Sequence, residues 1–208
     1  MKTCEYDGEP FNEPRSHPWT DAVANSACRY YDFKTEPGLI RTVLEDFLPW
    51  SHYPAVTLLY ELLERLNAPA SIFESNDCAF SAPHKSEAPQ VSKILQCDGR
   101  VMILYRELGL NRSLRRLEGL KNALHLHLAA LDREFEWGMI GTTILPVLYI
   151  DLPVAQDQQL GYQLMISFWA WGDSEAEVMS NLERVLENLA QAVGESMSMT
   201  PHSPTAER

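Results

Sequence analysis

The spacing of apolar residues predicts three amphipathic helices in this chain. Their apolar positions recur every three or four residues, which is the period of one helix face. The first helix begins at Pro54, whose missing N–H costs nothing in a first turn, and ends at Asn67. The second covers residues 113–131, and the third begins where Ser174 and Glu177 fit a capping box.

Asp98-Gly99 is the strongest short signal for a hairpin turn, because a type I′ turn needs positive φ at both central residues. We therefore expect one strand over Val91–Cys97 and the next over Arg100–Arg106. This turn would set two cross-strand pairs, Leu95 with Met102 and Ile94 with Ile103.

Other alternating or β-branched segments complete the predicted sheet. Ser71–Phe73 and Cys78–Ser81 flank a turn-rich cluster and form either one irregular strand or a short hairpin. Thr142–Ile150 and Tyr162–Trp171 predict a further hairpin. Pro146 removes one backbone donor, so we expect an edge or a bulge at this position.

These elements predict an α+β fold over residues 51–194, with an antiparallel sheet in the order α-βββ-α-ββ-α and Gly194 ending the last helix. Residues 1–50 are predicted to be an N-terminal arm with a short helix over 38–48. The arm contains several aromatic residues, so we expect it to pack on the domain. Residues 195–208 are rich in Ser, Thr and Pro and predict a disordered tail.

The charge of the chain narrows the expected partners. With 29 acidic and 17 basic residues, the formal net charge is -12. This charge argues against nucleic acid and anionic membranes as partners, and it favours basic or polar protein partners. The N-terminus lacks an apolar signal segment, and the apolar run at 144–150 is shorter than the roughly 20 residues of a membrane span. We therefore expect a cytoplasmic protein.

Residue types that carry chemistry form no recognisable catalytic pattern. Cys4, Cys28, Cys78 and Cys97 lack C-x-x-C spacing, which favours reduced thiols over a metal or redox motif. His125 and His127 lie two residues apart on a helix and should point to different sides, whereas a helical zinc pair has four-residue spacing. The sequence therefore predicts no enzyme, no cofactor and no metal site.

Trp169 and Trp171 share one face of their predicted strand, opposite Ile166 and Phe168. Either both strand faces are buried, or the tryptophans form an exposed patch of the kind that marks an interaction surface. Burial inside a dimer is a third possibility.

Three stretches of the chain carry a resemblance to a known family: LNAPASIFESNDCAFS, KILQCDGRVMILYRELG and IGTTILPVLYIDLP. With the order of helices and strands, they resemble the specialised chaperones of type III secretion systems. These are small acidic cytoplasmic homodimers that hold the N-terminal segment of a secreted effector. The predicted arm is longer than is usual in that family.

The resemblance implies binding by strand addition at a sheet edge and by apolar grooves, without catalysis. The candidate partner-binding residues are Leu59, Leu63, Ile72, Phe73 and Phe80. The candidate dimer-interface residues are Leu117, Leu124, Leu128, Ile144 and Val147. Each of them is alternatively a core residue, because periodic apolar positions usually are.

Other functions remain open. An aromatic pocket formed by Trp169, Trp171 and Tyr149 would suit a small-molecule-binding protein. A regulatory or immunity protein with the same α+β layout is a further alternative, and bacterial sensory-transduction-like regulators have a similar order of elements.

Overall fold

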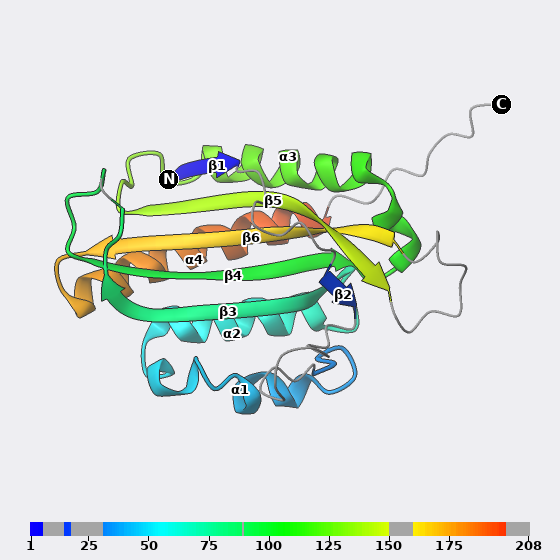
Figure 1. Cartoon of the computed structure of the whole chain (residues 1–208), viewed down its shortest axis with the longest axis horizontal. Helices are drawn as coiled ribbons and strands as arrows, with labels where there is room; N and C mark the ends of the chain where they lie inside the picture. Colours follow the sequence, from blue (N-terminus) through cyan, green and yellow to red (C-terminus); the bar gives the residue numbers. More distant parts are fainter. Residues whose placement is uncertain (6–14, 18–30, 89, 150–159, 199–208) are drawn as a thin grey trace.

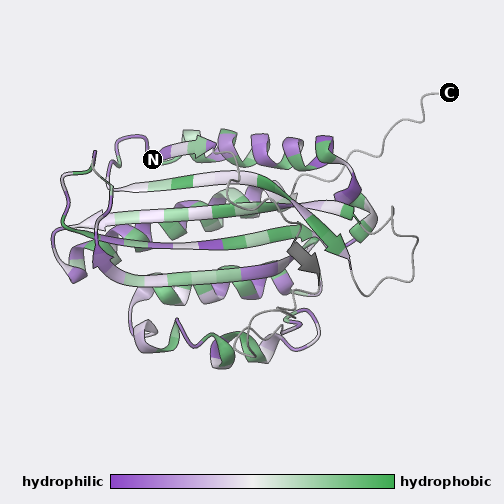
Figure 2. Cartoon of the chain, viewed as in Figure 1, coloured by the Kyte–Doolittle hydropathy of each residue, from purple (hydrophilic) through white to green (hydrophobic). Residues whose placement is uncertain are grey.

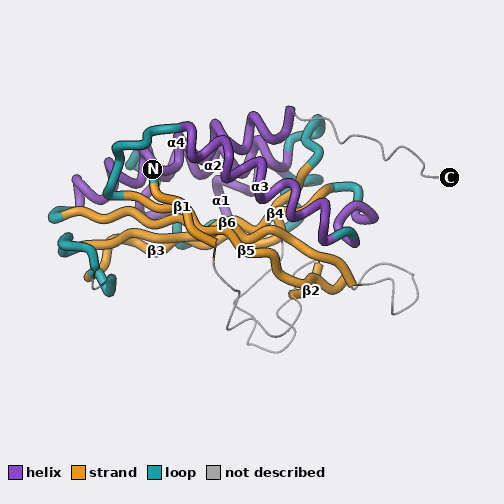
Figure 3. The backbone as a smooth tube through the Cα atoms, turned by 90° about the horizontal axis from the view of Figure 1, so that it is seen from above, coloured by secondary structure: helices purple, strands orange, loops and turns teal. Residues whose placement is uncertain are grey.

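One layer of helices packs on one face of a six-stranded sheet (Figures 1 and 3). The computed structural model describes residues 1–5, 15–17, 31–88, 90–149 and 160–198. The main helices are α2 (Pro54–Asn67), α3 (Leu114–Ala130) and α4 (Glu175–Ser198), with a short α1 (Ile40–Val43). The strands are β1 (Lys2–Glu5), β2 (Arg15–His17), β3 (Phe73–Lys85), β4 (Leu95–Tyr105), β5 (Gly138–Tyr149) and β6 (Leu160–Gly172).

The strand order is β1-β5-β6-β4-β3, and β2 also pairs with β5. The four long strands are antiparallel to their neighbours, whereas β1 and β2 run parallel to β5. The predicted α+β class is confirmed, but the sheet is mixed instead of antiparallel. The two parallel strands were missed because segments of three and four residues show no usable alternation.

The predicted hairpin at Asp98-Gly99 is wrong, because β4 passes through both residues as one continuous strand. Asp98 lies opposite Trp169 and Gly99 lies opposite Phe168. No glycine in the described part of the chain has positive φ, which a type I′ turn would require. Gly99 instead makes room for a neighbouring ring, since an added Cβ would lie 2.5 Å from Cζ of Phe168.

β4 pairs with β3 on one side and with β6 on the other, and β3 continues through the turn-rich cluster at 74–77. The pairs expected across the false turn, Leu95 with Met102 and Ile94 with Ile103, therefore do not form. Two strands precede α3 instead of three, and the order from α2 onward is α-ββ-α-ββ-α.

The sequence predicts an edge or a bulge at Pro146, and one side of β5 is indeed unpaired with any described strand at this residue. It pairs with Tyr162 of β6, while on the other side of β5 the contacts of β1 end at Thr142. The contacts of β2 begin at Val147. No described strand therefore faces Pro146 on that side, and its missing N–H breaks no ladder bond there.

The helix boundaries follow the predictions at α2 and α3 but not elsewhere. In place of one helix over 38–48, the chain forms α1 and two 3₁₀ turns, Pro37–Leu39 and Leu48–Trp50. At α4, the backbone N–H of Glu177 donates to Ser174 Oγ at 3.2 Å, which confirms the cap. The helix continues past Gly194 to Ser198, and residues 199–208 of the predicted tail lie outside the described residues.

The main core lies between the sheet and the helix layer. Along each long strand, residues that point into this core alternate with residues on the opposite face of the sheet. In β6 the core residues are Leu164, Ile166, Phe168 and Ala170, as predicted. The sheet surface opposite the helices is called the far face below. A smaller apolar group on that face contains Met102, Leu145 and Met165.

Candidate functional site at the outer edge of strand β3

Strand β3 forms one edge of the sheet and pairs with β4 alone among the described strands. Its register with β4 is irregular between Ser75 and Asp77 and again between Ser81 and His84. The regular stretch Cys78–Ser81 lies between these irregularities, and we call it the β3 edge stretch. An edge strand presents backbone N–H and C=O groups to any added strand, so this stretch is the first candidate site.

The beginning of β3 is held by neighbouring segments. Lys34 Nζ lies 2.6 Å from the buried carboxylate of Glu74. The side-chain amide of Asn67 donates to Ser75 Oγ at 2.8 Å and accepts from the Ser75 N–H at 3.2 Å. These contacts hold the beginning of β3 against α2 and the segment before it, and so they fix the position of the edge stretch that follows.

The far face beside the edge stretch carries a chain of hydrogen bonds across three strands. Trp171 Nε1 donates to Gln96 Oε1 at 3.0 Å, and Gln96 Nε2 donates to Asp98 Oδ2 at 2.9 Å. His84 Nε2 lies 3.4 Å from the same carboxylate oxygen. Trp171 is buried with its indole N–H satisfied, whereas Trp169 is half-buried.

Arg100 and Asp77 form the next polar contact on the far face, with Arg100 Nε 3.1 Å from Asp77 Oδ2. The prediction missed Gln96, Asp98 and Arg100 as surface residues because it assigned a turn to this segment. Their alternation with Cys97 and Gly99 is the period-2 signal that could have placed them on one strand face.

The thiols of Cys78 on β3 and Cys97 on β4 are expected to be unreactive. Burial raises the pKa of Cys78 to about 12 and that of Cys97 to about 12. Thiols of such high pKa stay protonated at neutral pH and are poor nucleophiles. Cys97 Sγ also donates to the carbonyl of Ser81 at 3.3 Å, so it holds one end of the edge stretch. Cys97 is buried in its strand as predicted, whereas Cys78 is half-buried.

The predicted partner-binding residues come together, but inside the core. Leu59 and Leu63 of α2 are fully buried, and Phe73 and Phe80 of β3 are 1% and 5% exposed. Ile72 is partly buried against the same cluster. Their side chains therefore support β3 from the helix side.

The predicted dimer-interface residues are also covered within one chain. Leu117, Leu124 and Leu128 lie on the inner side of α3. Ile144 is partly buried against the main core, and Val147 is fully buried. Any contact made by α3 with another molecule would use its opposite side.

The aromatic residues proposed for a pocket do not meet. Trp169 and Trp171 lie at the end of β6, opposite Asp98 and Gln96. Tyr149 lies at the far end of β5, beyond the pairing of Leu148 with Leu160 at the start of β6. At about 3.3 Å per residue, these positions are separated by most of the sheet.

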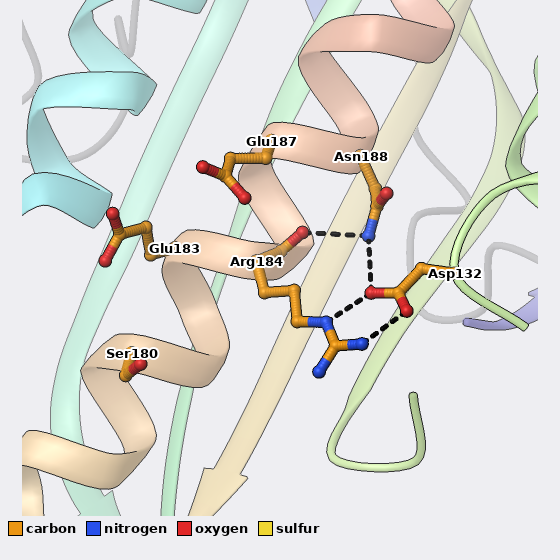
Figure 4. A pocket seen from close by; sticks show the side chains of 6 residues that line it. All are labelled: Asp132, Ser180, Glu183, Arg184, Glu187 and Asn188. Carbon is orange, nitrogen blue, oxygen red and sulfur yellow. Dashed lines mark hydrogen bonds and ion pairs between the residues drawn. The ribbon is translucent and has the colours of Figure 1, made fainter. Parts of the chain in front are cut away.

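A polar hollow of about 420 Å³ lies over the outer side of α4 (Figure 4). Asp132 accepts hydrogen bonds from two guanidinium nitrogens of Arg184, which hold the pKa of that carboxyl below its usual range. Glu183 and Glu187 point away from Asp132 in this view. The charged groups that approach one another are therefore already paired, and they offer no converging set for catalysis.

His125 and His127 point to different elements, as predicted. His125 Nε2 lies 2.6 Å from Thr142 Oγ1 on β5, and burial lowers the pKa of this imidazole. His127 Nδ1 lies 2.6 Å from Glu195 Oε2 on α4. Within the described ranges, no three His, Cys, Asp or Glu side chains are grouped to hold a metal ion.

No helix in the described part of the chain has both the length and the apolar character needed to cross a bilayer. Comparison of the chain with protein-family models, curated proteins and solved structures gives no match.

Proposed function

We propose that this chain is a non-catalytic binding protein that holds an extended segment of a partner polypeptide as an added strand along Cys78–Ser81. The observation that supports the proposal is the position of this stretch at the sheet edge, where β4 pairs with it on one side and no described strand lies on the other. Main-chain pairing supplies affinity without requiring one partner sequence, while neighbouring side chains select among segments.

The side chains at the edge stretch suit close approach by another backbone. Ser81 is exposed and Ala79 is half-buried, and both are small. The neighbouring Asp98 carboxylate is 27% exposed. With a net charge of -12, the chain favours a basic or polar partner segment.

The family resemblance makes the proposal more specific. In the secretion chaperones, the partner is a secreted effector, and the chaperone works as a homodimer in the cytoplasm. We extend both properties to this chain as part of the proposal. Only two strands, β3 and β4, lie between α2 and α3, whereas the resemblance implies three. We therefore assign the partner contact to the edge of β3.

The test is co-expression of the chain with the product of the neighbouring reading frame, followed by co-purification and hydrogen exchange. We expect a stable complex in which backbone amides of the β3 edge stretch exchange more slowly than in the chain alone. A solution mass of the chain alone tests the homodimer separately. Absence of a complex, or slowed exchange confined to other elements, would contradict the proposal.

A matched pair of variants distinguishes edge pairing from a general charge effect. Ser81→Lys adds a cation at the edge stretch, while Ser180→Lys makes the same change at an exposed position of α4. Like charges brought together across a strand pair are unfavourable. We therefore expect weaker binding of a basic segment to Ser81→Lys and unchanged binding to Ser180→Lys.

A further inference from the structure

The outer side of α3 carries two large, exposed hydrophobic side chains, Leu114 and Leu126. We call the exposed residues of this helix the α3 outer face: Leu114, Arg115, Glu118, Gly119, Asn122, Leu126, Ala129 and Ala130. Leu126 is 72% exposed, the highest value among the large hydrophobic side chains of the described residues, and Leu114 is 41% exposed. The inner side of the same helix already supplies its share of the core through Leu117, Leu120, Leu124 and Leu128.

The N-terminal end of α3 is basic in an acidic protein. Residues 112–118 contain Arg112, Arg115 and Arg116 and one acidic residue, Glu118, a net charge of 3 − 1 = +2, whereas the whole chain carries -12. Arg112, Arg115 and Arg116 form no ion pair with any described residue. Figure 2 shows strongly hydrophilic residues interleaved with hydrophobic ones along α3.

Helix stability does not explain these arginines. Arg115 and Arg116 lie in the first turn of α3 and Arg112 lies just before it, where the helix dipole disfavours positive charge. The N-cap residue Ser113 makes no side-chain capping bond that would offset this cost. Arg112 and Arg115 are exposed and therefore available to an anionic group of another molecule.

We propose that the α3 outer face docks an acidic amphipathic helix of a partner protein. Its carboxylates would lie beside Arg112, Arg115 and Arg116, and its apolar side would cover Leu114 and Leu126. Arg115 and Leu126 are separated by about 16 Å along the helix axis, so a partner helix of about three turns reaches both. Gly119 between them lacks a side chain and allows the two helices to approach closely.

Charge and shape favour another protein over the other possible occupants. A second copy of this chain offers acidic α4, but the exposed α4 positions are Glu175, Ala176, Ser180, Arg184, Glu187, Gln191 and Glu195. None of these is a large apolar residue, so α4 could not cover Leu126. Nucleic acid would meet a protein of net charge -12 through only three cations. This partner is acidic, so it differs from the basic segment proposed for β3.

The experiment uses the full chain and a fluorescent peptide of about 18 residues, which is long enough to be partly helical. The peptide consists of Glu, Ala and Leu, with its leucines on one helix face. A scrambled peptide of the same composition and a DNA duplex serve as comparison probes. Binding is followed by fluorescence anisotropy at two salt concentrations.

Two variants and one control locate the site. Arg112→Gln/Arg115→Gln/Arg116→Gln should weaken peptide binding about tenfold, because three ion pairs are lost. Leu126→Ser should weaken it several-fold with no loss of stability, because this side chain is already exposed. Lys2→Gln/Arg65→Gln/Lys85→Gln removes the same charge from exposed positions outside the α3 outer face and should leave binding unchanged.

Three results would overturn the proposal. The first is that the amphipathic peptide does not bind at about 100 µM. The second is that the scrambled peptide or DNA binds equally well, and the third is that the control triple variant weakens binding as much as the arginine triple variant. Self-association of the chain that disappears in Leu126→Ser, without any peptide binding, would assign the face to a second copy instead.

Discussion

The ring of Phe168 on β6 covers Gly99 on β4, at the position where any other residue would carry its side chain. A Cβ atom at Gly99 would lie 2.5 Å from Phe168 Cζ and 2.5 Å from the carbonyl oxygen of Ala79. Both distances are shorter than packed atoms allow. The glycine is therefore required by the approach of neighbouring atoms and not by a turn.

Replacement of Gly99 by alanine should destabilise the protein. We expect Gly99→Ala to lower the free energy of unfolding by about 1–3 kcal/mol, since the ring and the strand must move apart. Gly119→Ala is the matched control, because nothing lies within 4 Å of its added Cβ. In the middle of α3 that change should raise stability by about 0.5–1 kcal/mol. Denaturant unfolding of both variants measures the difference, and equal effects would contradict this account of Gly99.

The buried side-chain amide of Asn111 stabilises the end of β4. It accepts from the Tyr105 N–H at 2.7 Å and donates to the Tyr105 carbonyl at 2.8 Å. Asn111→Ala should lower the free energy of unfolding by about 1–3 kcal/mol, because two partly buried backbone groups lose their partners. Asn122→Ala, at an exposed position of α3, should be neutral or stabilising. A thermal melt in which both variants behave alike would refute the assigned role.

His125 should make stability fall on mild acidification. Its pKa is lowered in the folded chain because burial disfavours the charged imidazole. The unfolded chain, whose histidine titrates near pH 6.5, then binds more protons than the folded chain below that pH. This contribution is complete above about pH 6.5 and is lost as the pH falls through the folded pKa. The slope cannot exceed about 1.4 kcal/mol per pH unit for one group.

Unfolding of the wild type and of His125→Gln at several values between about pH 7.5 and pH 5 tests the assignment. The variant should lose part of the pH dependence. An identical slope in the two proteins would assign the dependence to other groups.

The thiols of Cys78 and Cys97 should resist alkylation in the folded protein. With a pKa of about 12 for each, only about one thiol in ten thousand is ionised at pH 8. Site-resolved mass spectrometry after iodoacetamide treatment should find both residues unmodified until denaturant is added. Rapid labelling of Cys78 in the native state would show that the helix side of β3 opens readily.

The regular helices could be predicted because their signal is local. The buried leucines of α3 recur every three or four residues over about three turns, and their burial follows directly from that spacing. Asp98-Gly99 shows the limit of such local reasoning. The dipeptide favours a turn, but the ring of Phe168, which lies 69 residues further along the chain, decides its conformation.

The candidate site could be predicted only in part for the same reason. The residues of Cys78–Ser81 are enough to predict a strand. The position of this strand at the sheet edge depends on the order of all the strands, which its own residues do not reveal. The predicted contact residues Leu59 and Phe80 were correctly recognised as apolar and periodic. Their pattern could not distinguish a groove from the core that buries them.

The parallel pairing of β1 with β5 has a consequence for the order of assembly. Lys2 pairs with Met139, and the amino group of Met1 donates to the carbonyl of Leu131 at 3.3 Å. The ribosome therefore delivers β1 long before β5 exists, and contacts of such long sequence separation form slowly. The residues of β1 are thus synthesised well before β5, but they can reach their place in the sheet only after it.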